Sequence, residues 1–174
     1  NKHLTNQEQI VEMQQNARMA IDHITREIRM AGYDPKKTGY FTFQLAASND
    51  RATSHSSIAF TYDYNGDGIQ YWNDSEQVAF RVENGVLQRF STGSVHWQPL
   101  VENIESLAFA YTLKDGAVIA PPTDPTAAQL ANVDTVTIAV TAKAAKEDPG
   151  YTDPTYNDHY RRYTLTASVS PRNL

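Results

Sequence analysis

The sequence contains no cysteine, and this absence excludes disulfide bonds, thiolate catalysis, iron–sulfur clusters and zinc sites built on cysteine. Long hydrophobic runs are also missing, because none exceeds the length of Leu107–Tyr111, whereas a membrane-spanning helix needs about 20 apolar residues. No segment is rich in lysine and arginine, and 15 basic against 20 acidic residues give a formal net charge of −5. This mildly acidic balance argues against nucleic acid as a partner.

Signatures of catalysis are missing as well. The five histidines have no metal-ligand spacing, no serine lies in a nucleophile elbow, and no glycine-rich phosphate or dinucleotide loop occurs. Carboxylates are plentiful, but nothing in the sequence singles out two of them as an acid–base pair. We therefore expect neither an enzyme nor a small-molecule substrate, and an enzyme of unknown type is the least favoured alternative.

A long amphipathic helix is predicted at the N-terminal end. Neither glycine nor proline occurs between Thr5 and Ala31, and apolar residues recur every three, four or seven positions, which places them on one face. These residues are Ile10, Ala17, Ile21, Ile24, Ile28 and Ala31. Thr5–Glu8 fits a capping box, so the helix is expected to begin there, and Gly32 and Pro35 are expected to end it. A helix with one apolar face must pack on another element.

The rest of the chain has the pattern of β-structure. Alternating apolar and polar residues, rich in valine, isoleucine, threonine and aromatic side chains, predict strands. The predicted strands are Ser57–Tyr62, Gln77–Val82, Val86–Phe90, Asn103–Leu113, Val133–Lys143 and Tyr160–Val169. Asn84-Gly85 predicts a hairpin turn, because both residues tolerate positive φ. The proline-containing segments Ala120–Pro125 and Glu147–Asp158 are predicted to be loops.

Together these elements predict an α+β protein in which a long N-terminal α-helix packs on an antiparallel β-sheet. Residues 1–37 are expected to form the helix and the turn that ends it. Residues 38–174 are expected to form a β-rich head that makes one domain with the helix. The length of 174 residues suits a single domain.

The segment Asp63–Asp74 has the spacing of an EF-hand calcium loop. Oxygen-bearing side chains stand at loop positions 1, 3 and 5, glycine at position 6 and a carboxylate at position 12. Alternate side chains of a tight loop converge on one point, and Gly68 permits the backbone conformation that this turn requires. The expected calcium ligands are Asp63, Asn65, Asp67, Ile69 through its carbonyl oxygen, and Asp74.

A plain polar turn is the alternative to a calcium site, since Asn-Gly and Asp-Gly form turns without metal. Asp74 stands where glutamate is usual, and the flanking segments look like strands instead of the EF-hand helices. Four acidic residues without a nearby lysine or arginine favour a cation, which would relieve their repulsion; they are Asp63, Asp67, Asp74 and Glu76. With a Kd of about 0.1 mM, about 1 mM calcium would contribute roughly 1.4 kcal/mol, enough to order a loop.

The acidic segment Glu147–Asp158 is a second place where a cation could bind. The alternative is a solvated loop whose carboxylates pair with Arg161 and Arg162, which follow it directly. Solvated acidic loops are common, so ion pairing is the favoured interpretation of this segment.

Three segments together resemble the PilW-like minor pilins of bacterial type IV pili, and more distantly the J-type minor pseudopilin of type II secretion. Met13–Pro35 resembles the polar half of the pilin helix with its Ala-Gly-Tyr turn. Trp97–Thr112 is similar to a strand that both families carry, and Arg161–Leu174 resembles the end of the chain with its terminal Arg-Asn-Leu. The turn Asn65–Gly68 and the later hairpin at Asn84-Gly85 occur in the same order as in the family.

This resemblance implies a role in assembly and no catalysis. Pilin-like subunits are made with a leader peptide and are anchored in the inner membrane, facing the periplasm, through an apolar helix half. Minor pilins of this type then join a priming complex that ends at the extracellular pilus tip. The implied partners are other minor pilins or pseudopilins, and a tip adhesin. A minor pseudopilin of a type II secretion system and a calcium-dependent surface adhesin are the alternatives.

The resemblance also predicts what precedes Asn1. The leader, the N-methylated phenylalanine, the nearby glutamate and the apolar helix half of the family do not occur in this sequence. They are expected directly upstream, so that the helix continues into a membrane anchor. The apolar residues nearest that end are expected to be exposed here and covered by neighbours in a filament; they are Leu4, Ile10, Val11 and Met13.

Overall fold

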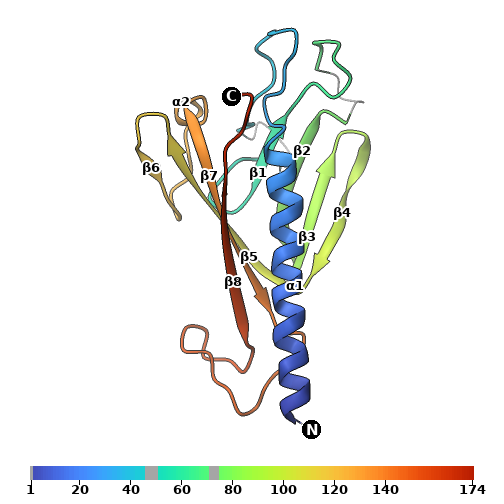
Figure 1. Ribbon diagram of the computed structural model, residues 1–174, viewed down its shortest axis with the longest axis vertical. Helices are drawn as coiled ribbons and strands as arrows, with labels where there is room; N and C mark the ends of the chain where they lie inside the picture. The colour runs from blue at the N-terminus through green and yellow to red at the C-terminus, as the bar shows by residue number, and fades with distance from the viewer. Residues whose placement is uncertain (1, 46–50, 71–74) are drawn as a thin grey trace.

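The computed structural model describes residues 2–45, 51–70 and 75–174, and shows a long helix lying across two antiparallel sheets (Figure 1). The helices are α1 (Lys2–Ile28) and α2 (Ala127–Leu130). The strands are β1 (Ile58–Thr61), β2 (Gln77–Glu83), β3 (Val86–Ser91), β4 (Ser94–Glu102), β5 (Ile104–Leu113), β6 (Val118–Ile119), β7 (Val133–Lys143) and β8 (Arg162–Val169). The first sheet has the strand order β1-β2-β3-β4, and the second sheet has the order β6-β5-β7-β8. The predicted α+β class is confirmed.

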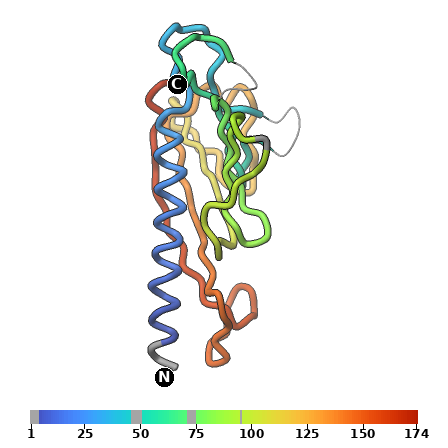
Figure 2. The backbone as a smooth tube through the Cα atoms, turned by 90° about the vertical axis from the view of Figure 1, so that its right-hand side faces the viewer, coloured from blue at the N-terminus to red at the C-terminus, as the bar shows by residue number. Residues whose placement is uncertain are grey.

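The apolar stripe of α1 faces the sheets. It packs mainly on β7 and β8 of the second sheet and also contacts β4 of the first (Figures 1 and 2). Its buried residues are Met13, Ala17, Ala20, Ile21, Ile24 and Ile28. One hydrophobic cluster joins this stripe to the inner faces of both sheets, so the helix closes the space between them.

The ends of α1 differ from the prediction. The helix already includes Lys2, so Thr5 lies inside it and the predicted start at a capping box is wrong. A capping-box sequence marks a start only where the backbone before it is not helical. At the other end the amides of Met30 and Ala31 bond to carbonyl groups three residues earlier, which tightens the last turn. Gly32 then takes a φ of +76°, as expected of the residue that ends the helix.

The N-terminal half of α1 is only partly covered. Ile10 is 37% exposed and Val11 is 50% exposed, which confirms that these two apolar side chains face solvent. Met13 is only 3% exposed, so the expectation that it is exposed is wrong, because its position continues the inward stripe of Ala17. The side chain of Leu4 lies outside what the structure describes. Of the helices in the described part of the chain, none is long and apolar enough to cross a membrane.

All six predicted strands occur, with ends shifted by at most two residues, but they divide between two sheets. The predicted hairpin joins β2 to β3, with Asn84 and Gly85 at φ values of 51° and 75°. The single strand that the resemblance implies over Trp97–Thr112 is divided at Asn103 into β4 and β5. The alternating pattern does not predict β4, because Pro99 interrupts it. Proline is tolerated there because β4 is the edge strand of the first sheet, where a missing N–H need not break a ladder.

Two long connections lie at opposite ends of the molecule. The β1–β2 connection lies beside the C-terminal end of α1, and the connection between β7 and β8 lies beside its N-terminal half (Figures 1 and 2). We call residues 144–161 the β7–β8 loop. The candidate calcium ligands belong to the first connection, and the acidic segment Glu147–Asp158 belongs to the second.

Candidate functional site

The strand pairing brings the two ends of the β1–β2 connection together. β1 and β2 are antiparallel neighbours in which Thr61 lies opposite Gln77. The amide of Tyr62 donates to the carbonyl oxygen of Glu76 at 3.0 Å, which extends the ladder by one step. Asp63 and Glu76 therefore leave the same end of the first sheet as neighbours. The loop is flanked by strands, as its sequence predicts, and not by the helices of an EF-hand.

Asp63 organises the first half of the loop. Its carboxylate is fully buried and accepts hydrogen bonds from the amides of Gly66 at 2.7 Å and Gly68 at 2.9 Å. Gly68 has a φ of +73°, and a Cβ atom there would lie 2.8 Å from the Cδ atom of Lys36. Glycine at loop position 6 is thus favoured by the backbone conformation, and the Lys36 side chain would also have to shift to admit a Cβ atom there.

Polar side chains fold the next residues of the loop in the same way. The amide of Asp67 donates to Oδ1 of Asn65 at 2.9 Å, and the amide of Ile69 donates to Oδ1 of Asp67 at 2.7 Å. The Nζ atom of Lys36 donates to the carbonyl oxygen of Asp67 at 2.8 Å, which ties the loop to the segment after α1. Lys36 is thus a cation beside the loop, although it lies far from it in the sequence.

Three carboxylates of the loop meet at one place. Asp63, Asp67 and Glu76 each offer an oxygen, and these oxygens lie within 4.8 Å of one another. Calcium binds oxygen at about 2.3–2.6 Å, so two ligands on opposite sides of one ion lie up to about 5 Å apart. The spacing and the hard oxygen donors therefore fit a calcium ion, and Mg²⁺ fits less well because it demands shorter and more regular coordination.

The predicted ligands are brought together only in part. Asp63, Asn65 and Asp67 lie in one compact loop. Ile69 belongs to the same loop, because its backbone N–H donates a hydrogen bond to the Asp67 carboxylate. Asp74 lies outside the described residues. Glu76 was recognised in the sequence as one acid of the group but not as a ligand. Pairing of β1 with β2 is the signal that places Glu76 opposite Tyr62, and so beside Asp63 at the same end of the sheet.

The acidic segment of the β7–β8 loop surrounds a guanidinium group. Nη1 of Arg162 donates to Asp153 at 3.1 Å, and its two terminal nitrogens donate to the Asp158 carboxylate at 2.8 and 2.7 Å. Arg162 also forms a two-pronged pair with Glu105 of β5, with Nη2 at 3.0 Å from Oε1. The Arg162 side chain is 8% exposed, so the guanidinium itself is largely shielded from water, whereas the Asp158 side chain is 32% exposed. The predicted pairing of Arg162 with this acidic segment is confirmed.

Further contacts fix the rest of the β7–β8 loop. Arg161 pairs with Asp148 at 2.8 Å, and Nδ2 of Asn6 on α1 donates to the same carboxylate at 3.3 Å. The guanidinium groups of Arg161 and Arg162 lie over the rings of Tyr151 and Tyr156, at 4.5 and 3.9 Å from the ring centroids. A connection without regular secondary structure is thus held in a defined shape beside α1.

The same contacts perturb two carboxyl groups. The hydrogen bonds from Arg162 hold the pKa of Asp158 well below its usual range. The amide of Tyr156, with Arg162 as a smaller cause, lowers the pKa of Asp153. Since both folded-state pKa values are lowered, this contribution to stability is present at neutral pH and is lost as the pH falls below about 4.

A surface pair that sequence reasoning missed joins two loops. Nδ1 of His55 lies 2.6 Å from Oδ1 of Asp124, and the amide of His55 donates to the same oxygen. That backbone bond, followed by the imidazole, lowers the pKa of Asp124. Both side chains are exposed, so the pair is a surface contact that links the segment before β1 to the proline-containing loop Ala120–Pro125.

The comparisons with known proteins agree with this architecture. The family described as "Prepilin peptidase-dependent protein B" matches residues 6–170. Among solved structures, a type IV-like pilin from Thermus thermophilus has the same fold, with a TM-score of 0.56 and 12% sequence identity. The alignment covers 92% of this chain and 97% of that one. No curated protein matches the chain significantly.

Proposed function

Because the chain belongs to the prepilin peptidase-dependent protein B family, we propose that it acts as a minor pilin in type IV pilus biogenesis. The observation that carries the proposal is the family match over residues 6–170 on a helix-and-sheet fold. In this role the chain is a building block with no catalytic step. Within pilus biogenesis, we place it in the priming complex that initiates the filament and later lies at the filament tip.

The uneven covering of α1 supports assembly through the helix. Ile24 and Ile28 are fully buried on the sheets, whereas Ile10 and Val11 are left in solvent on the same helix. Exposed apolar side chains on a helix become favourable when a neighbouring surface covers them. We propose that other minor pilins or pseudopilins cover this part of α1. Before assembly, an apolar helix half upstream would anchor the subunit in the inner membrane.

Deletion and complementation of the gene test this role. We expect deletion to reduce surface pili at least tenfold, and the full-length gene to restore them. Normal piliation together with a loss of secreted enzymes would instead identify a minor pseudopilin of type II secretion. If both pili and secretion persist while chelator-sensitive binding to glycans is lost, the chain is an adhesin. A full-length gene without a leader and an apolar stretch directly upstream of Asn1 would contradict all pilin-like roles.

We also propose that the β1–β2 connection holds a structural calcium ion. The proposed ligands are Asp63, Asn65, Asp67, the carbonyl oxygen of Ile69, and Asp74. Glu76 is added to them because its carboxylate lies close to those of Asp63 and Asp67. The support is the convergence of the Asp63, Asp67 and Glu76 oxygens within 4.8 Å. Close carboxylates repel one another, and a divalent cation changes this repulsion into attraction.

Calcium is expected to raise the melting temperature of the chelator-treated protein. With a Kd of about 0.1 mM, about 1 mM calcium adds roughly 1.4 kcal/mol, or about 3–6 °C for a chain of this size. The double variant Asp63→Asn/Asp67→Asn should lose this shift, because it removes two charges from the site. Asparagine at position 63 has one acceptor oxygen for the two amides of Gly66 and Gly68, so without calcium the variant should be less stable than the parent, and the calcium shift of each protein is measured against its own calcium-free state.

Asp134→Asn serves as the matched control, because Asp134 is an exposed carboxylate on β7 outside this loop. It should show the same calcium shift as the parent protein. The calcium proposal fails if several mM calcium leaves the melting temperature unchanged, or if the double variant and the control respond equally. Calorimetric titration with calcium then measures the affinity directly.

A further inference from the structure

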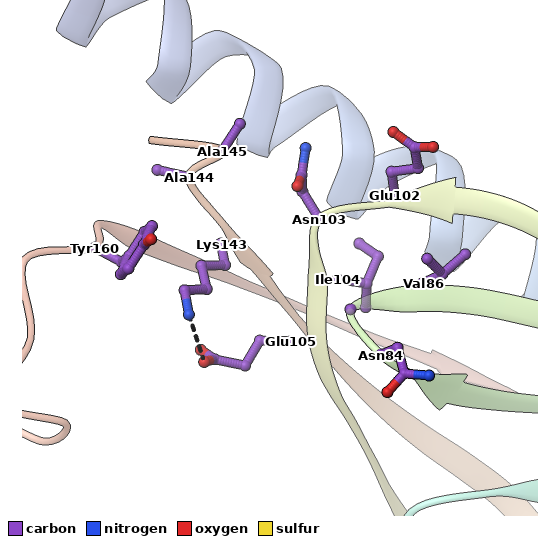
Figure 3. Close-up of a pocket in the computed structure, with 11 residues that line it drawn as sticks. Asn84, Val86, Glu102, Asn103, Ile104, Glu105, Lys143, Ala144, Ala145 and Tyr160 are labelled. Carbon is purple, nitrogen blue, oxygen red and sulfur yellow. Dashed lines mark ion pairs between the residues drawn. The ribbon is translucent and has the colours of Figure 1, made fainter. Parts of the chain in front are cut away.

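A cavity of about 430 Å³ lies where the chain crosses from β4 to β5, between the first sheet and the base of the β7–β8 loop (Figure 3). Asn84, Val86 and Glu102 line it from the first sheet. Lys143, Ala144, Ala145 and Tyr160 line it from the second sheet and the loop, and Asn103, Ile104 and Glu105 connect the two walls. The cavity is therefore built from segments that are distant in sequence.

One wall of the cavity is fixed by ion pairs. Figure 3 shows Lys143 and Glu105 pointing toward one another, and their charged groups lie 3.7 Å apart. Glu105 is also held by Arg162, and the Lys143 ammonium lies 4.1 Å from the centroid of the Tyr160 ring. These contacts keep the wall in one arrangement, so a ligand would meet a surface that is already organised.

The charge of the lining is negative in sum. Its charged side chains are the carboxylates of Glu102 and Glu105 and the ammonium of Lys143. Lys143 pairs with Glu105, which leaves the charge of Glu102. Glu102 is exposed and has no ion-pair partner within the described residues. A ligand with a positive charge is therefore attracted, and an anion is repelled.

The apolar part of the lining indicates which kind of cation the cavity suits, a charged side chain or a free metal ion. Val86, Ile104 and the two alanines give the cavity an apolar side, next to the carboxylates and the amides of Asn84 and Asn103. Lysine and arginine side chains have this combination, with an apolar stem and a charged head. A bare divalent cation would need several oxygens converging within about 2.6 Å of one point.

We propose that this cavity binds a lysine or arginine side chain of a neighbouring pilin-like subunit, with Glu102 as the anchor for its charge. The inference rests on the proposed function, since assembly supplies the neighbour. It assigns the β4–β5 crossing and the base of the β7–β8 loop to one interface, on the side of the molecule that flanks α1 (Figure 1).

Site-specific photo-crosslinking in the full-length protein tests the partner. The photoreactive residue p-benzoylphenylalanine is placed at Ala145, an exposed residue that lines the cavity, and at Thr166, an exposed position on β8, as control. We expect an adduct from position 145, identified by mass spectrometry as another pilin-like subunit joined next to a lysine or arginine. A second copy of this chain as the only adduct, equal adducts from both positions, or no adduct would overturn the proposal.

Charge reversal at the anchor tests the chemistry. Glu102→Lys should reduce the adduct and the number of pili about tenfold, and Glu102→Gln should reduce them less, because one charge-assisted pair is lost or reversed. Asp134→Lys, a charge reversal outside the cavity, should leave both unchanged. An unchanged melting temperature shows that the variants fold. If gene deletion abolishes pili but Glu102→Lys does not, the cavity proposal fails and the proposed function stands.

Discussion

Replacing Arg162 by methionine is expected to destabilise the protein by about 3 kcal/mol or more at pH 7, which lowers its melting temperature by about 6–12 °C. The methionine keeps an apolar stem of similar length but removes the charge that Glu105, Asp153 and Asp158 share. Breaking a shielded pair on one side is costly because the remaining charges are left close together without compensation. Thermal unfolding followed by circular dichroism measures the loss.

The pH dependence separates this mechanism from a loss of packing. In the parent protein the carboxyl groups of Asp153 and Asp158 have lowered pKa values, so stability falls as the pH drops through their range. Without the guanidinium, the crowded carboxylates should have raised pKa values, so the variant gains stability as they become protonated. The gap between parent and variant is therefore expected to be widest at pH 7 and to narrow as the pH falls below about 4 and through the lowered pKa values of the parent.

The neighbouring arginine provides the control. Arg161 pairs with one carboxylate and its side chain is 35% exposed, so Arg161→Met should cost less than about 1 kcal/mol. Arg162→Lys should fall between the two, because a lysine keeps the charge but cannot form the two-pronged bonds. Equal effects of Arg161→Met and Arg162→Met, or a gap that is as wide at pH 3 as at pH 7, would contradict the role of Arg162.

Local sequence patterns predicted the elements but not their pairing. The stripe of α1 and the Asn84-Gly85 hairpin follow from spacing and turn chemistry, and both occur as expected. The division into two sheets could not be predicted, because an alternating strand pattern does not say which strand lies beside it. The edge strand β4 was missed because Pro99 argues against a strand in the interior of a sheet, and the sequence does not show which strands lie at an edge.

The candidate sites show the same limit. The loop spacing predicted that Asp63, Asn65 and Asp67 gather, because their contacts are local. The nearby positions of Asp63 and Glu76 depend on the pairing of β1 with β2, and the position of Lys36 depends on the turn after α1. In the same way, Arg162 was expected to pair with the acids preceding it, but its bond to Glu105 comes from the second sheet.

Shortening Ile24 to alanine is expected to cost about 2–5 kcal/mol, because the side chain is completely buried between α1 and the sheets. The removed groups lose their contacts and leave a cavity that the surrounding side chains fill only in part. Urea unfolding should show a lower midpoint with an unchanged slope, as expected when stability changes without a change in the surface exposed on unfolding. An effect below about 1 kcal/mol would mean that the stripe does not hold the helix to the sheets.

Ile10→Ala is the same chemical change on the same helix, and it should distinguish an effect on folding stability from an effect on pilus assembly. Ile10 is 37% exposed, so its loss should change the stability of the isolated chain by less than about 1 kcal/mol. If neighbouring subunits cover this part of α1, the same substitution in the full-length protein should reduce piliation, whereas stability stays near that of the parent. Ile24→Ala should reduce both together, because a subunit that does not fold cannot assemble. Normal piliation with Ile10→Ala would contradict an interface on the exposed part of the helix, although it would leave the packing role of Ile24 unchanged.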